Sequence, residues 1–167
     1  MPNLKLQVSR ALSVIPSANT NIPMPNVIVN GTATATTTGK LVDSTKNFSS
    51  SGVNPLNIQV GDTVYNNTLS SAATVTNVDS ATQLSLNSNI MLSTNSYTLY
   101  SGTNTTGSVE PCVLYVGVGG DLNVTTAGGD VVNFVGIASG SFLPVQVIRV
   151  NSVVTASDII ALWWWYR

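Results

Sequence analysis

The sequence contains no histidine among its 167 residues, and it carries a single cysteine, Cys112. A serine–histidine–aspartate or cysteine–histidine catalytic site is therefore excluded, because the base that activates the nucleophile is missing. A zinc site needs a cluster of cysteine and histidine ligands, which one cysteine cannot supply. The same count rules out a disulfide within the chain.

Charged residues are also scarce. Six Lys and Arg and seven Asp and Glu make up 8% of the chain and leave a net charge of −1, whereas roughly 25% is usual in soluble domains. A nucleic-acid partner would require a basic stripe, and this composition provides none. The surface must consist of Thr, Ser and Asn or be covered by other subunits, so we expect a homo-oligomer.

Long apolar runs are missing as well. The first ten residues hold no apolar run of signal-peptide length, and no segment approaches the roughly 20 apolar residues of a membrane span. We therefore expect no membrane partner. The protein should be made in a host cytoplasm and leave it by cell lysis or as part of a particle.

The seven carboxylates are scattered, and no local spacing predicts the facing pair that a glycosidase requires. Four of them adjoin predicted turns, where an aspartate commonly accepts hydrogen bonds from its own backbone. The alternative is a calcium site built from two of these loops. The four residues are Asp62, Asp79, Asp121 and Asp130. We predict no catalytic site, no cofactor and no metal site.

The clearest pattern that is present lies in the last third of the chain. Val113–Val116 is β-branched and aromatic, which is typical of a strand buried on both faces. Residues 122–125 alternate between apolar and polar, as a half-buried strand does. Further strands are predicted at 131–137, 143–150 and 159–163, with glycine-rich turns between them. Five short strands predict a small antiparallel β-sandwich or barrel.

The middle of the chain repeats short strand patterns between polar turns, and it predicts a second small β-barrel. The sequence from 31 to 39 suits a strand, and 40–54 suits a loop with one helical turn near 44–48. We expect an all-β protein in two modules. Residues 1–26 plus 111–167 would form a docking β module, and residues 27–110 an inserted module that projects from it.

Two separate stretches, 10–25 and 113–163, together resemble a module of tailed-phage and gene-transfer-agent virions, the head spike base or capsid-surface proteins. The matching residues are Val14–Ser17, Ile22-Pro23, Leu114–Gly117, Gly119–Leu122, Gly128–Val131, Phe134, Gly140, Leu143–Val145, Arg149-Val150 and Ile160–Trp163. The middle block is similar to an accessory β module of phage structural proteins, through Thr32–Thr34, Leu41–Ser44, Val60–Tyr65, Ala73–Val75 and Thr82–Leu84.

This resemblance implies a virion structural protein on the phage capsid surface, either a decoration protein or the base of a vertex spike. Its partners would be the major capsid protein or other virion proteins, together with sister subunits. The protein would act by binding and would catalyse no reaction.

The aromatic end of the chain is the feature that most requires a partner. In an alternating strand Trp163 and Trp165 face one side, and Trp164 and Tyr166 face the other. One pair could complete the core and leave the other exposed, and Trp and Tyr are favoured anchors of interfaces. We predict that Trp163, Trp164, Trp165, Tyr166 and Arg167 form a subunit or capsid interface. The alternatives are burial of all of them in their own domain and stacking on a surface glycan, as in a tail- or fibre-associated adhesin.

Overall fold

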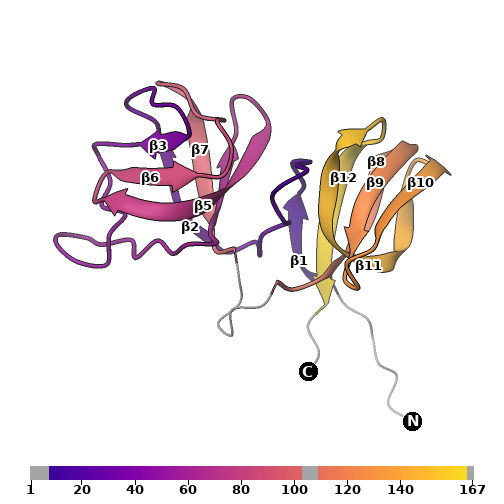
Figure 1. Cartoon of the computed structure of the whole chain (residues 1–167). Coiled ribbons are helices and arrows are strands. Elements are labelled where there is room, and N and C mark those ends of the chain that lie inside the picture. The colour runs from indigo at the N-terminus through magenta and orange to yellow at the C-terminus, as the bar shows by residue number, and fades with distance from the viewer. Residues whose placement is uncertain (1–7, 103–108, 165–167) are drawn as a thin grey trace, which may run out of the picture. The chain divides into compact units, whose positions relative to one another are not determined.

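The structure, a computed structural model, describes residues 8–102 and 109–164. Regular structure in these residues consists of twelve strands, and they form two six-stranded antiparallel sheets. The predicted all-β fold is thereby confirmed. The chain divides into two compact units (Figure 1): the end unit, Met1–Val14 with Pro111–Arg167, and the inserted unit, Ile15–Glu110.

The end unit is a single curled sheet in the order β1-β12-β8-β11-β9-β10. The long strand β11 pairs with β8 through its first half and with β9 through its second half. The register shifts between Leu143 and Val147, around Pro144, which has no N–H to donate. A strand that changes partners at such an irregularity turns the corner of a sandwich. The strands are β1 (Val8–Ser13), β8 (Cys112–Val118), β9 (Gly120–Thr126), β10 (Val131–Ile137), β11 (Ser141–Val154) and β12 (Ser157–Trp164).

The inserted unit is the second barrel-like module, in the order β2-β7-β4-β5-β6-β3. Its two outer strands are brought together, because Ala35, just after β2, forms a bridge with Val42 of β3. The N–H of Thr34 also donates to the carbonyl of Val42 at 2.8 Å. The strands are β2 (Val27–Thr32), β3 (Lys40–Val42), β4 (Thr63–Asn66), β5 (Ser71–Ser80), β6 (Gln83–Leu86) and β7 (Ser96–Tyr100).

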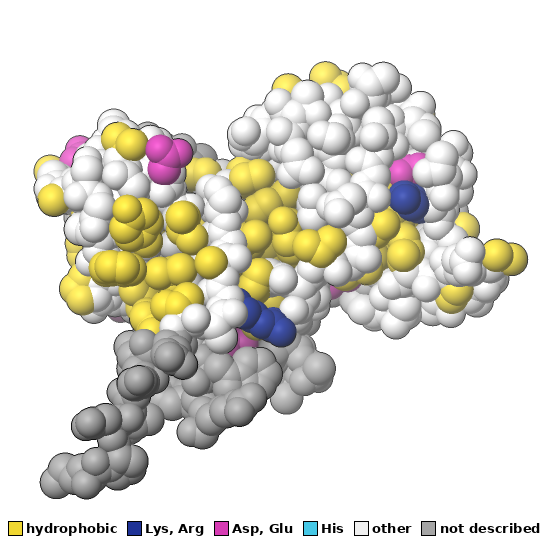
Figure 2. Space-filling model, turned by 180° about the vertical axis from the view of Figure 1, so that it is seen from behind, with side chains coloured by type: hydrophobic (Ala, Val, Ile, Leu, Met, Phe, Trp, Pro, Cys, Tyr) yellow, Lys and Arg dark blue, Asp and Glu magenta, His cyan; other side chains and the backbone are white. Residues whose placement is uncertain are grey.

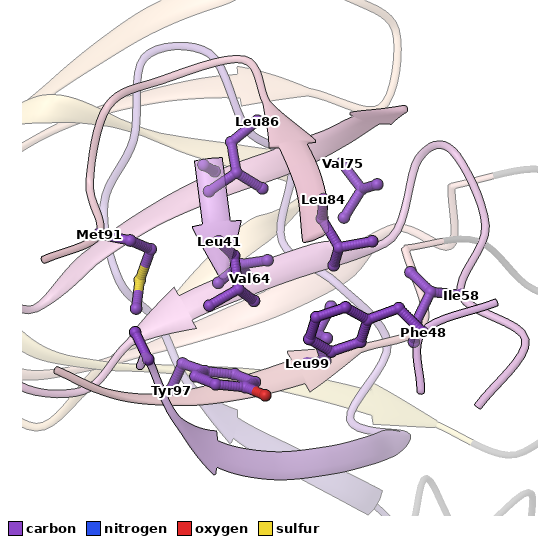
Figure 3. Close-up of a cluster of buried hydrophobic side chains, with 12 residues drawn as sticks. Leu41, Phe48, Ile58, Val64, Val75, Leu84, Leu86, Met91, Tyr97 and Leu99 are labelled. Atoms are coloured by element: carbon purple, nitrogen blue, oxygen red, sulfur yellow. The ribbon is translucent and has the colours of Figure 1, made fainter. Parts of the chain in front are cut away.

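The closed sheet of the inserted unit surrounds a core of buried side chains (Figure 3). The core residues come from every strand except β2 and from the loops beside them. They are Ala33, Leu41, Phe48, Ile58, Val64, Ala73, Val75, Leu84, Leu86, Met91, Tyr97 and Leu99. The sequence alternation in β6 is visible here, since Leu84 and Leu86 are buried while Gln83 and Ser85 are only half-buried.

Two details differ from the sequence-based expectations. Residues 15–26 group with the inserted unit and not with the chain ends, because the amide of Asn87 donates to the carbonyl of Asn19 at 3.1 Å and Thr20 is almost fully buried. The predicted helical turn near 44–48 is wrong. The carboxylate of Asp43 accepts from both the N–H and the hydroxyl of Thr45, which makes a turn in place of a helix.

Candidate interface on the end unit

Four neighbouring strands of the end unit, β1, β12, β8 and β11, present two faces with different surroundings. One face packs into the core of the unit. Its side chains include Leu12, Leu114, Val116, Leu143, Ile159, Ala161 and Trp163, all of which are buried. Side chains directly opposite each other in a sheet share a face, so the strand register also identifies the residues on the other side.

The other side of these strands is the outer face. Register places Ala11 beside Leu162, and Leu162 beside Val113. A second row runs across all four strands in the order Ser13, Ile160, Tyr115, Phe142. The outer face consists of Val8, Ala11, Ser13, Val113, Tyr115, Gly117, Phe142, Ile160, Leu162 and Trp164.

The outer face is apolar and open to solvent. Phe142 is 60% exposed and Val8 is 44% exposed, while Val113, Ile160 and Leu162 are half-buried by their neighbours on the sheet. Hydrophobic side chains with few charges among them are visible over this unit in Figure 2 (left). Four strands roughly 4.8 Å apart, with five residues roughly 3.3 Å apart along each, give a face of about 300 Å², within the range of functional patches.

The charged side chain of Asp158 lies opposite Gly117, in the row at one end of the outer face. The rings of Tyr115 and Phe142 pack against each other with centroids 5.4 Å apart and planes tilted by 59°. Other polar side-chain groups of this face include the hydroxyls of Ser13 and Tyr115. The outer face is therefore mainly apolar, with few hydrogen-bonding side chains.

The sequence explains why two faces of one sheet are apolar. Strands that are buried on both sides have continuous apolar runs instead of alternation. Val113–Val116 and Ile159–Trp164 are such runs. Among the residues that the structure describes, the end unit covers one face of these strands with its own core and leaves side chains such as Phe142 on the other face exposed.

The sequence-predicted interface residues are divided between these two faces. Trp163 is 3% exposed and lies in the core, whereas Trp164 is half-buried on the outer face beside Val8. Trp165, Tyr166 and Arg167 lie outside the described residues. Sequence reasoning missed the outer-face residues on β1, β8 and β11. The signal that could have found them was the unbroken apolar run at Val113–Val116.

A second exposed apolar feature lies on the edge strand β10. Val131 and Val135 are 67% and 73% exposed, and the strand carries no charged residue. Edge strands of this kind invite pairing with another chain. The pairing of β10 with β9 is irregular between Phe134 and Ile137, and Gly136 has a φ of +66°. This bulge twists the edge and weakens it as a template for a further strand.

The four turn aspartates do not meet. Each of three carboxylates is occupied by donors from its own surroundings: Asp62 accepts from the N–H groups of Gln59 and Gly102, Asp79 from Lys40 and Ser85, and Asp121 from the N–H of Gly136. Burial raises the pKa of Asp62, and these two N–H donors only partly oppose that rise. No group of three His, Cys, Asp or Glu side chains in the described residues could hold a metal ion.

The remaining buried charge is Asp43 in the inserted unit. Its Oδ2 accepts from the Tyr97 hydroxyl at 2.8 Å, and its Oδ1 accepts from the N–H and hydroxyl of Thr45. Burial alone would raise the pKa of Asp43, but the hydrogen bonds from Thr45 and Tyr97 and the charge of Lys46 hold it below its usual value. Both carboxylate oxygens of Asp43 accept hydrogen bonds, so we assign the Asp43–Tyr97 pair a structural role.

In the part of the chain that is described, no helix is long and apolar enough to cross a membrane. Comparison with known proteins gives no match to a family model, to a curated protein or to a solved structure.

Proposed function

We propose that this chain is a non-enzymatic structural protein of a phage particle, located on the capsid surface as a decoration protein or as the base of a vertex spike. In this proposal the end unit binds the shell and sister subunits, while the inserted unit projects. The observation that carries the proposal is the uncovered apolar outer face. Such a face on a charge-poor chain offers a surface for an apolar partner, and the residue pattern of this unit resembles virion surface modules.

The mechanism is burial of apolar area, repeated over many copies. A face of about 300 Å² is small beside the roughly 800 Å² per partner of a standard interface. A single contact through it is therefore weak. Many copies on one particle bind with avidity, because each bound contact raises the effective concentration of the next, and a ligand that binds only the folded shell stabilises that shell.

The test is the composition of purified particles. Phage particles from cells that produce this chain are purified through a density gradient and analysed by mass spectrometry, and the chain is then located by cryo-electron microscopy. We expect it in repeated copies on the outside of the shell. Absence of the chain from infectious particles, or its recovery only in the soluble fraction, would overturn the proposal.

The other function considered from the sequence, an adhesin module that binds cell-surface carbohydrate, predicts a different result. Sugar sites combine an aromatic platform with several hydrogen-bonding groups, and the outer face offers Trp164, Tyr115 and Phe142 but few polar groups. A glycan array is the direct comparison. Specific binding that is lost in Trp164→Ala, by a chain that is absent from particles, would favour the adhesin over the capsid protein.

A further inference from the structure

We infer that the outer face of the end unit is covered by the same face of a second copy of this chain, related to the first by a twofold axis that runs parallel to the strands. The inference assigns the outer face to the contact between sister subunits that the proposed function includes, so a dimer would have to bind the shell through another surface. It rests on the distribution of side-chain sizes across the face. Large side chains lie at one end of the face and small ones at the other, so two copies that face each other in opposite orientations would match large against small.

The row that crosses all four strands shows this distribution most clearly. Ser13 on β1 is followed by Ile160 on β12, Tyr115 on β8 and Phe142 on β11. The two rings at the β11 end pack together and form a ridge, and Phe142 is 60% exposed. The β1 end of the face has the small side chains of Ala11 and Ser13.

A twofold axis along the strands, between β12 and β8, exchanges the two ends of this row. Phe142 of each copy then lies over Ser13 of the other, and Tyr115 lies over Ile160. In the neighbouring row Leu162 lies over Val113. An isologous contact of this kind uses the same patch on both subunits and closes at two copies. Aligned sheets pack in this way in β-sandwiches.

Charge and size favour the same occupant. A face without charged side chains at its centre requires an equally apolar partner surface, and a second copy supplies one. Asp158 lies opposite Gly117 in the row at one end of the face, outside the rows that carry Ile160, Leu162 and Val113. The competing site for self-association, the edge of β10, is interrupted by its bulge near Gly136. Because the face is about 300 Å², well below the roughly 800 Å² per partner of stable complexes, the dimer should be reversible.

The first test is the mass of the full chain by sedimentation, from roughly 5 μM to roughly 500 μM, the range in which a small interface is half-occupied. We expect the average mass to rise from monomer towards dimer. Phe142→Lys should weaken the association by at least roughly tenfold, because the lysine charge would lose its water in the contact. Val135→Lys is the matched control, since Val135 is 73% exposed on β10 and lies off the face.

The second test fixes the orientation. Ser13→Cys protein and Phe142→Cys protein are treated with a short bismaleimide, separately and mixed. We expect crosslinked dimers in the mixture and few in either variant alone. In the twofold arrangement position 13 of one subunit lies near position 142 of the second subunit. Two copies of position 13, or two copies of position 142, are separated by the width of three strands. The native Cys112 is buried and should not react.

A chain that stays monomeric at the highest concentration would overturn the inference, and so would equal association of Phe142→Lys and Val135→Lys. Crosslinking of each single variant as efficient as that of the mixture would overturn the twofold arrangement. Circular dichroism confirms that Phe142→Lys is folded, which the high exposure of Phe142 leads us to expect. A monomer that is nevertheless present in particles would contradict this inference alone and leave the proposed function standing.

Discussion

The hydroxyl of Tyr97 on β7 donates to Oδ2 of Asp43 at 2.8 Å, and Asp43 directly follows β3. Both residues are almost fully buried. The bond joins segments that are 54 residues apart in the sequence. Gly31 on β2 makes room for it, because a Cβ at that position would collide with the Tyr97 hydroxyl. Three strands of the inserted unit, or the residues next to them, therefore meet at this one pair.

Tyr97→Phe should destabilise the inserted unit by about 1–3 kcal/mol, since it leaves a buried carboxylate oxygen without its donor. Tyr115→Phe is the matched control, because Tyr115 lies half-buried on the outer face of the end unit, and it should change stability by less than about 0.5 kcal/mol. Calorimetry of the two variants measures this difference. Equal midpoints for both variants would mean that the Tyr97–Asp43 bond contributes nothing to stability.

Gly31→Ala should cost about 1–3 kcal/mol through overpacking, because its Cβ would lie only 2.8 Å from Oδ2 of Asp43. Gly128→Ala, whose Cβ would have no contact closer than 3.4 Å, should be nearly neutral. In the double variant Gly31→Ala, Tyr97→Phe the missing hydroxyl relieves part of the collision. Urea denaturation should therefore show a cost smaller than the sum of the two single variants, and strict additivity would contradict this geometry.

Acid should weaken the inserted unit through Asp43. Its pKa is held below its usual value in the folded state, so the unfolded chain takes up the proton first as pH falls. The stability that Asp43 contributes is thus complete above the unfolded pKa of about 3.9 and is lost as pH falls through the folded pKa. Asp62, whose pKa is raised, works in the opposite direction and reduces the net effect.

The measurement is the unfolding midpoint of the wild type and of Asp43→Asn between about pH 6 and about pH 2.5. We expect Asp43→Asn to be less stable at neutral pH and to lose less stability on acidification. The salt bridge between Asp79 and Lys40, at 2.9 Å, also holds the pKa of Asp79 down. Because the salt bridge between Asp79 and Lys40 is open to solvent, it contributes little to the loss of stability in acid. Parallel pH profiles for the wild type and Asp43→Asn would contradict the assignment.

The fold class could be predicted from the sequence because it is determined by local residue patterns. Period-2 alternation and turn residues located most strands, including residues 131–137. It failed where pairing between distant segments decides the structure. The polar segment near Asp43 suited a helical turn, but the carboxylate takes the N–H of Thr45 and is held in turn by Tyr97, a contact that no local window contains.

The candidate interface shows the same limit. The run Val113–Val116 predicts a strand buried on both faces, and alternation predicts that Trp163 and Trp164 point in opposite directions, as they do in the structure. Which of the two faces the chain covers by itself depends on β12 and β11 lying beside β8 and on β1 lying beside β12. Their register comes from segments at both ends of the chain, so the row from Ser13 to Phe142 could not be read from the sequence.

Cys112 offers a direct measure of how tightly the end unit is closed. It is 1% exposed, its Sγ donates to the carbonyl of Val147 at 3.5 Å, and burial raises the pKa of the thiol to about 12. At pH 8 the thiolate, which is the reactive form, is therefore depleted by roughly a thousandfold relative to an exposed cysteine. Native protein should resist an aromatic disulfide reagent that labels the guanidinium-unfolded chain at once.

Substitution of Trp163 or Trp164 in the same labelling experiment distinguishes a core side chain from a surface side chain. Labelling of native Cys112 requires the unit to open, so its rate follows the free energy of opening. Trp163→Leu creates a cavity in the core and should accelerate labelling roughly fivefold or more, since large-to-small core changes cost about 1–3 kcal/mol or more. Trp164→Leu alters the outer face and should leave the rate nearly unchanged. Equal acceleration by both variants would mean that Trp164 also stabilises the fold. The outer face would then be part of the folded core and not a surface available to a partner.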